Sequence, residues 1–106
     1  MTQVAVVIVN WNGAPFIGRC LDAVFAQTRR PDEVVVVDNG STDNSVELIR
    51  DGYPGVRLIA RESNGGFAQG HNLGIQNTKS DYILILNTDV FLDRDFLCEA
   101  QKAIEQ

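Results

Sequence analysis

The chain has 106 residues, of which 44% are hydrophobic and 22% charged, and its formal net charge is -5 at pH 7. A chain of this length forms one domain, residues 1–106, with a single modest core. The acidic balance and the lack of any lysine or arginine cluster exclude a nucleic-acid-binding patch and a polybasic membrane surface, because both need concentrated positive charge. Cys20 and Cys98 lack the spacing of a zinc site or a disulfide framework, so we expect reduced thiols buried on helices.

The apolar run at residues 4–9 has no basic segment before it and ends at Asn10, so it does not read as a signal peptide. No stretch approaches the roughly 20 apolar residues of a membrane-spanning helix. We therefore expect a cytoplasmic protein, with the full-length form either free or peripheral at the inner membrane face.

The first predicted strand is this same run, apolar throughout, which is typical of a parallel strand buried on both faces. Asn10, Trp11, Asn12 and Gly13 follow it, and the two amides and the glycine are either turn formers or ligand contacts. Apolar residues at helical spacing, with a proline suited to the first turn, then predict an amphipathic helix that packs on the core: Pro15, Ile17, Cys20, Leu21, Val24 and Phe25.

The second predicted strand contains four consecutive valines, residues 34–37, and is the best candidate for the sheet centre. Asp38 ends it, which places a carboxylate at the carboxyl end of a buried strand, where open α/β sheets bind ligands. Gly40 permits a sharp turn, and residues 41–43 offer three side chains able to cap a helix over residues 45–50.

A third, shorter strand is predicted at residues 56–60, and Arg57 within it indicates a sheet edge. The glycine-rich stretch that follows could open a helix facing an anion, although it lacks the spacing of a dinucleotide loop or a P-loop. Gly70 and Gly74 stand four residues apart on this helix, which predicts close contact with the sheet or with a ligand. His71, the only histidine, is expected to be a surface or hydrogen-bonded residue rather than a catalytic one.

A fourth strand is predicted at residues 82–86, followed by a second carboxylate at a strand tip, Asp89, and by a last helix that Asp93 caps. Alternating strands and helices predict a doubly wound, mostly parallel α/β sheet with helices on both faces. If the first strand is central, the tips that carry Asn10, Asp38 and Asp89 line one cleft.

These residue types suit a nucleoside diphosphate. An ionised Asp38 can only accept hydrogen bonds, so its partner would be an imide N–H, as in uracil or thymine, or a ribose hydroxyl. Asp89 suits a hard divalent cation that keeps several waters and takes its other ligands from phosphates.

Five segments in series carry a family resemblance: VVIVNWNG, CLDAVFAQT, VVVVDNGSTDNS, NGGFAQGHNLGI and DYILILNTD. In this order they resemble the inverting family-two glycosyltransferases of the GT-A fold, and especially the rhamnosyltransferase-type members. The resemblance covers nearly the whole chain. It implies a transferase that uses a UDP- or dTDP-sugar, with a slight preference for thymidine, and acts in cell-wall or polysaccharide synthesis on a glycan, lipid or other hydroxyl acceptor.

The resemblance also implies roles for individual residues. Asp38 would contact the nucleotide base, and Asn10 would lie beside the nucleoside. Asn64, Gly66 and Asn72 are similar to the family motif that lines the donor pocket.

Asn87, Thr88 and Asp89 occupy the position of the family's Asp-x-Asp metal motif, which binds Mg²⁺ or Mn²⁺. The first acid is replaced by Asn87, so we expect metal binding to be weaker or more dependent on the diphosphate. His71 stands where an asparagine is more usual.

Family members continue about as far again, and that second half supplies the acceptor site and the general base. No catalytic residue can therefore be assigned here. We expect a truncated donor-binding half that binds nucleotide at most. The strand that ends at Asn87 would have an exposed edge open to self-association.

Three alternatives remain at this point. A receiver-like signalling module would need paired acids after the first strand, where the chain has Asn10 and Asn12. A sugar nucleotidyltransferase would need a basic glycine-rich loop, and residues 11–17 contain no basic residue. A fragment without ligand affinity is the third.

Overall fold

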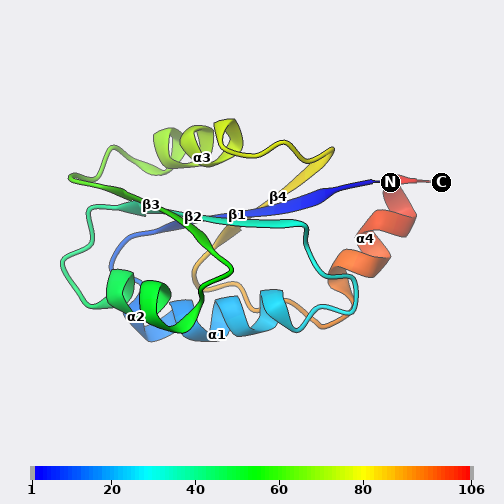
Figure 1. Ribbon diagram of the computed structural model, residues 1–106, viewed down its shortest axis with the longest axis horizontal. Helices are drawn as coiled ribbons and strands as arrows, with labels where there is room; N and C mark the ends of the chain where they lie inside the picture. Colours follow the sequence, from blue (N-terminus) through cyan, green and yellow to red (C-terminus); the bar gives the residue numbers. More distant parts are fainter. Residues whose placement is uncertain (1, 106) are drawn as a thin grey trace.

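The computed structural model describes residues 2–105. Strands and helices alternate along the chain, and the four strands form one parallel sheet in the order β3-β2-β1-β4 (Figure 1). The predicted fold class is confirmed, as are the central place of the first strand and the edge position of the strand that contains Arg57. The elements are β1 (Val4–Asn10), α1 (Ala14–Phe25), β2 (Glu33–Asn39), α2 (Ser45–Gly52), β3 (Arg57–Arg61), α3 (Phe67–Gln76), β4 (Tyr82–Asn87) and α4 (Phe96–Ile104).

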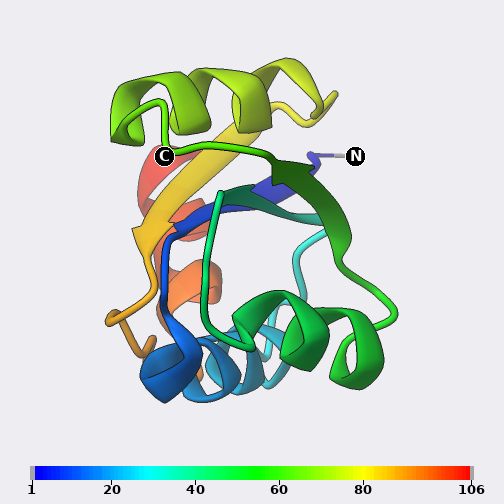
Figure 2. The same cartoon turned by 90° about the vertical axis from the view of Figure 1, so that its left-hand side faces the viewer.

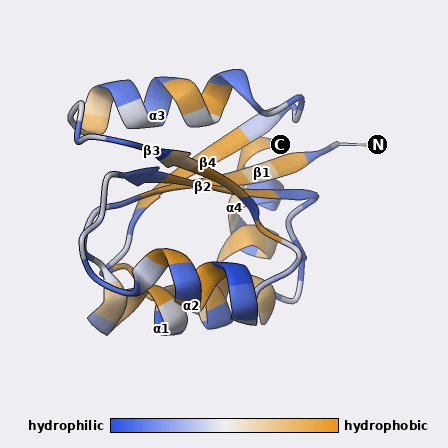
Figure 3. Cartoon of the chain, turned by 60° about the vertical axis from the view of Figure 1, so that its left-hand side comes forward, coloured by the Kyte–Doolittle hydropathy of each residue, from blue (hydrophilic) through white to orange (hydrophobic). Residues whose placement is uncertain are grey.

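Helices cover both faces of the sheet. α1 and α2 lie on one face and α3 on the other, while α4 lies on the α1 side beyond the end of that helix (Figures 1 and 2). Hydrophobic residues concentrate on the strands, and the helices alternate hydrophobic and hydrophilic residues (Figure 3). This arrangement explains the uninterrupted apolar run of β1, all of whose residues are buried.

The chain reverses its direction of travel across the sheet at β1. It runs outward from β1 through β2 to β3, and then α3 carries it back to place β4 on the other side of β1. The crevice between the carboxyl ends of β1 and β4 is therefore the topological switch point, where open α/β sheets bind their ligands.

α3 packs unusually close to the sheet through its two buried glycines. A Cβ on Gly70 would lie 2.9 Å from Val9 Cγ1, and a Cβ on Gly74 would lie 2.4 Å from Val7 Cγ1. The close contact predicted from the glycine spacing is thus with the sheet. It holds the start of α3 against the tips of β1 and β2.

Two local details of the fold bear on the sequence predictions. The prediction that Asp93 caps the last helix is wrong, because the helix begins at Phe96 with Asp95 at the N-cap position, and the Asp93 carboxylate accepts the N–H of Asp95 at 3.0 Å in the preceding turn. Both cysteines are free, as predicted, with Cys20 buried and Cys98 half-buried.

Among the helices described here, none has the length and apolar character needed to cross a membrane.

The close packing of α3 predicts a position-specific response to added methyl groups. Gly74→Ala should destabilise the protein by about 1–2 kcal/mol, because overpacking against Val7 exceeds the gain in helix propensity. Gly52→Ala is the matched control, since no atom outside its neighbouring residues and its own helix backbone lies within 4 Å of its added Cβ. Urea denaturation should show no loss of stability for Gly52→Ala. Equal stability of the two variants would contradict the close contact between α3 and β1.

Candidate functional site

A partly open cleft of about 270 Å³ lies at the switch point between β1 and β4. The two strands are in register here, with Val9 opposite Asn87, and the turns beyond them form the walls. We call this feature the tip cleft. Its lining residues are Val9, Trp11, Asn12, Gly13, Phe16, Phe67, Asn87, Thr88 and Asp89.

The tip cleft combines exposed aromatic rings with oxygen ligands. Trp11 is 50% exposed, Phe16 44% and Phe67 56%, and all three line the cleft. Exposed rings around a cleft offer flat apolar surfaces to a planar base or to a sugar face. Sequence reasoning assigned none of these rings a role, because Trp11 reads as part of a turn and Phe67 as the first residue of a helix.

Asp38 and Asn10 sit side by side at the tips of β2 and β1, as the parallel register requires. Asp38 is 2% exposed, and its Oδ1 accepts hydrogen bonds from Asn10 Nδ2 at 2.8 Å and from Ser41 Oγ at 2.6 Å. Its Oδ2 accepts the N–H of Ser41 at 3.0 Å. A carboxylate has about four acceptor positions, so Asp38 keeps about one unused. Of the three tip residues expected to line one cleft, Asp89 lines the tip cleft, whereas Asn10 and Asp38 are buried and are not among its lining residues.

A second set of hydrogen bonds ties the turn after β1 to the turn after β2. Asn12, whose φ of 50° is tolerated better by asparagine than by most residues, accepts the N–H groups of Thr42 at 2.7 Å and Asp43 at 3.2 Å through its Oδ1. Asp43 in turn accepts the N–H of Ala14 at 3.0 Å, at the start of α1. Asn12 therefore acts as a turn former that fixes the wall of the tip cleft.

The glycine-rich stretch is shaped by asparagine side chains. Gly66, at φ 90°, donates its N–H to Asn64 Oδ1 at 2.7 Å, and its carbonyl accepts Asn39 Nδ2 at 3.0 Å. The turn is held by these hydrogen bonds and places Phe67 in the lining of the tip cleft. Asn64 is exposed beside it, and Asn72 is exposed on α3, opposite the glycine face that packs on the sheet; neither lines the cleft.

Asn87 and Asp89 are exposed in the tip cleft, where both side chains can offer oxygen to a cation. Within residues 2–105 no three His, Cys, Asp or Glu side chains form a group able to hold a metal. The nearby Cys20 thiol is neutral, because burial and then the charge of Asp89 raise its pKa to about 11. The donor set thus fits a hard cation that takes most of its ligands from phosphate and water.

A family model described as "Glycosyl transferase family 2" matches residues 5–106. The chain belongs to glycosyltransferase family 2. It is 35% identical over 91 residues to the glycosyltransferase GlyG of Streptococcus pneumoniae serotype 4, covering 81% of this chain and 30% of GlyG. It is 37% identical over 95 residues to the chondroitin synthase of Pasteurella multocida, covering 87% of this chain and 10% of the synthase.

Solved structures share the GT-A fold of this chain. The mannosyltransferase PcManGT from Pyrobaculum calidifontis, in complex with GDP-Man and Mn²⁺, superposes with a TM-score of 0.90 at 28% identity, covering 98% of this chain and 32% of that one. Residues 1–349 of S. aureus TarS with UDP superpose at 0.87 and 22% identity, over 98% and 32% of the two chains. The chain thus spans less than a third of the length of GlyG and about a third of these structures. Membership of glycosyltransferase family 2 counts against the receiver-like and nucleotidyltransferase alternatives.

The turn network predicts a pH-dependent contribution from Asp43. Partial burial opposes its ionisation, but hydrogen bonds from Ser45 and from the Ala14 N–H outweigh burial and lower the pKa of this carboxyl below its ordinary 3.8. The ionised form therefore stabilises the folded state above that pH, and this contribution is lost as the pH falls through the lowered pKa.

Asp43→Asn should accordingly cost about 1 kcal/mol of unfolding free energy at pH 7, and the difference from the unmodified protein should shrink at pH values below 3.8. Denaturant titrations at a series of pH values measure this. Asp51→Asn, at an exposed carboxylate on α2, is the control and should change little. A cost for Asp43→Asn that is independent of pH would rule out the charge-assisted bonds.

Proposed function

We propose that this chain is the donor-binding part of an inverting glycosyltransferase that transfers a sugar from a UDP- or dTDP-sugar to an acceptor hydroxyl. The observation that carries the proposal is the tip cleft, which joins aromatic walls to the oxygen ligands of Asn87 and Asp89 at the switch point of the sheet. The GDP-Man and Mn²⁺ complex of PcManGT and the UDP complex of TarS support a nucleotide diphosphate as the ligand class.

The nucleoside would lie across the tips of β1 and β2. The acceptor position left on Asp38 would receive an imide N–H. Asn10 would hold the carboxylate in place through its hydrogen bond to Asp38 Oδ1. Trp11, half-exposed at the end of β1, would stack on the base or the sugar. We propose Asn64, Gly66 and Asn72 as the outer part of the donor pocket, with Gly66 acting through the placement of Phe67.

A divalent cation, Mg²⁺ or Mn²⁺, would be held by the Asp89 carboxylate and the Asn87 amide oxygen. Bound there, it would supply charge stabilisation to the leaving diphosphate. One carboxylate and one neutral amide make a weak site by themselves, so the diphosphate would have to bring most of the remaining ligands together with water.

We propose no catalytic base among the described residues. Asp38 is buried and hydrogen bonded to Asn10 and Ser41, so we do not assign it as the base. We assign Asp89 to the cation. What this chain does for the reaction is to bind and orient the donor, and sugar transfer would need an acceptor site and a base from elsewhere. A rhamnose-type donor and a cell-wall or polysaccharide product are the specific form we propose. The teichoic acid poly(glycerol phosphate) polymerase of Staphylococcus epidermidis is among the relatives, at 26% identity over 93 residues.

Calorimetric titration tests this proposal. UDP, dTDP and GDP, each with and without Mn²⁺, should bind saturably only with the metal present, and the nucleotide with the lowest dissociation constant identifies the base of the donor. Asp89→Asn should weaken metal-dependent binding about tenfold or more, because it removes the only carboxylate among the described residues that line the cleft. Mn²⁺ alone should give no saturable heat.

Two controls give the titration its meaning. Asp51→Asn, on α2, removes one negative charge away from the tip cleft and should bind as the unmodified chain does. Circular dichroism of each variant shows that it is folded. No binding of any nucleotide by a folded chain would refute the donor-binding proposal, and sugar transfer to an acceptor by this chain alone would refute the absence of a base.

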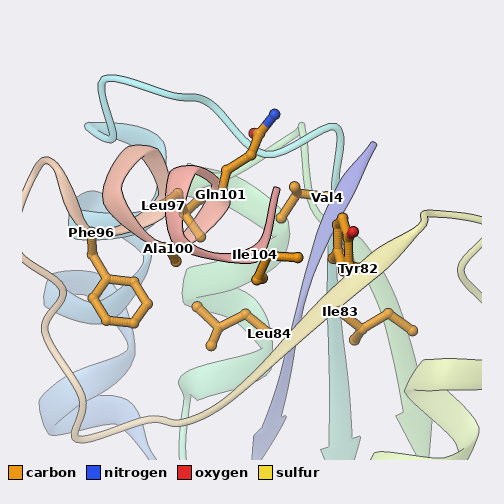
Figure 4. A pocket seen from close by; sticks show the side chains of 9 residues that line it. All are labelled: Val4, Tyr82, Ile83, Leu84, Phe96, Leu97, Ala100, Gln101 and Ile104. Carbon is orange, nitrogen blue, oxygen red and sulfur yellow. The ribbon is translucent and has the colours of Figure 1, made fainter. Parts of the chain in front are cut away.

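We further propose that the chain self-associates through the outer edge of β4. Among the described residues this edge is unpaired. Beside it an apolar hollow of about 100 Å³ lies between β4 and α4, with side chains of both elements pointing into it (Figure 4). An unpaired, apolar edge strand is a template for pairing with another chain. The hollow is lined by Val4, Tyr82, Ile83, Leu84, Phe96, Leu97, Ala100, Gln101 and Ile104.

Ile85→Lys should keep the chain monomeric over a concentration series in which the unmodified chain forms dimers or larger species. Ile85 lies on the edge strand and is 41% exposed, and a lysine there opposes strand pairing. Leu48→Lys on α2, at the same 41% exposure, is the matched control and should associate normally. Sedimentation velocity measures whether each sample is monomeric. An unmodified chain that stays monomeric at every concentration would exclude this interface.

A further inference from the structure

Gly13 lies in the turn between β1 and α1 and is buried there. Its φ of -91° and ψ of 17° are accessible to residues other than glycine, so the backbone conformation does not require a glycine. The space around it does. A Cβ at this position would lie 2.2 Å from Asn10 Oδ1, whereas real Cβ contacts are essentially never shorter than 3.0 Å. The amide of Asn10 therefore occupies the space that a side chain at position 13 would need.

The backbone of Gly13 is held in place by the start of α1. Its carbonyl accepts the N–H groups of Phe16 and Ile17 at 2.8 Å each. The N–H of Ala14, the next residue, donates to Asp43 Oδ2 at 3.0 Å. Moving this turn to make room for a Cβ would therefore disturb the hydrogen bonds that begin the helix.

The Asn10 amide is fully buried and is hydrogen bonded only through its nitrogen. Nδ2 donates to Asp38 Oδ1 at 2.8 Å and to Ser45 Oγ at 2.9 Å, with a longer contact to Ser41 Oγ at 3.3 Å, so both of its hydrogens are engaged. Oδ1 accepts no hydrogen bond from any residue that the structure describes. A Cβ at Gly13 would therefore displace this oxygen first. Because the amide is planar, Nδ2 would move with it, and the hydrogen bond to Asp38 would be distorted.

The orientation of this amide follows from its neighbours. Exchanging Oδ1 and Nδ2 would point an oxygen at the Asp38 carboxylate, which is an acceptor, and would lose that hydrogen bond. Asp38 thus keeps the Asn10 nitrogen toward itself, and the oxygen is the atom that faces Gly13.

We propose that Gly13 is a positioning residue that sets the base selectivity of the donor site through Asn10 and Asp38. With no side chain at position 13, Asn10 keeps its hydrogen bond to Asp38 and holds the carboxylate in one orientation. The acceptor position left on that carboxylate then receives the imide N–H of a base. The inference rests on the proposed donor-binding function and adds to it a residue on which recognition of the base depends.

UDP and CDP distinguish this role from a purely structural one. Uracil presents an imide N–H at the ring position where cytosine presents a lone pair, so only UDP can donate to Asp38 there. The two probes share the ribose and the diphosphate, and therefore the metal-dependent part of binding. General destabilisation lowers the folded fraction and weakens both probes equally, whereas displacement of Asp38 changes the ratio of their dissociation constants.

Calorimetry with Mn²⁺ measures that ratio. The unmodified chain should bind UDP more tightly than CDP by about tenfold or more, because cytosine cannot make the hydrogen bond to the charged acceptor, and Gly13→Ala should reduce the difference to about twofold or less. Gly18→Ala, on the same helix, is the matched control, since its Cβ would make an ordinary contact of 3.6 Å with Tyr53 Oη, and it should keep the full difference. A full difference in folded Gly13→Ala, or equal affinity of the unmodified chain for the two probes, would overturn the proposal.

Urea denaturation of the ligand-free chain tests the contact between Gly13 and Asn10. The background variant is Asn10→Ser, whose shorter side chain removes the amide oxygen and keeps a hydrogen-bond donor. Gly13→Ala should lower the urea midpoint of the unmodified chain, and should lower that of Asn10→Ser by less than about half as much. Equal shifts in the two backgrounds would overturn the proposal. If Gly13→Ala does not fold, the double variant should fold, and a double variant that does not fold would overturn the proposal as well.

The two measurements separate this inference from the proposed function. A chain that binds neither UDP nor CDP refutes the donor-binding proposal, and the urea series then decides whether Gly13 positions the Asn10 amide.

Discussion

The structure of the tip cleft depends on one buried carboxylate. Asp38 sits at the end of a strand enclosed on both faces, where a charge is tolerated only with hydrogen-bond donors around it. Asn10 and Ser41 supply those donors, and in doing so they join the end of β1 to the turn after β2. The requirement to satisfy one charge therefore fixes two neighbouring turns at once.

Fixing these turns also fixes what projects from them. The turn after β1 carries Trp11 and leads into α1, whose first N–H group Asp43 accepts. On the other side, Asn39 holds the carbonyl of Gly66 and thereby the start of α3 with Phe67. The aromatic walls of the cleft are thus held by hydrogen bonds behind them, which leaves their faces free for a ligand.

The sequence predicts the sheet well because its signals are strong and local. Apolar runs without alternation mark buried parallel strands, and the order of elements predicts that Asn10 and Asp38 meet. The aromatic lining was missed because Trp11 and Phe67 are far apart in the sequence. They line the same cleft only because α3 crosses the sheet from β3 back toward β4. Asn72 is exposed because Gly70 and Gly74 pack against the sheet and Asn72 lies on the opposite face of the helix. The hydrogen bonds that the Asn10 amide forms depend on the orientation of its side chain, which no pattern of residue types specifies.

Charge decides how this cleft can bind a diphosphate. Its lining contains Asp89 and no lysine or arginine, within a chain of net charge -5, so a bare diphosphate would meet repulsion. A divalent cation held by Asp89 would reverse the sign of the charge at that point. With asparagine at position 87, the lining offers one carboxylate to a cation and no cationic side chain to a diphosphate. On the proposed function, metal and nucleotide would therefore enter this cleft together.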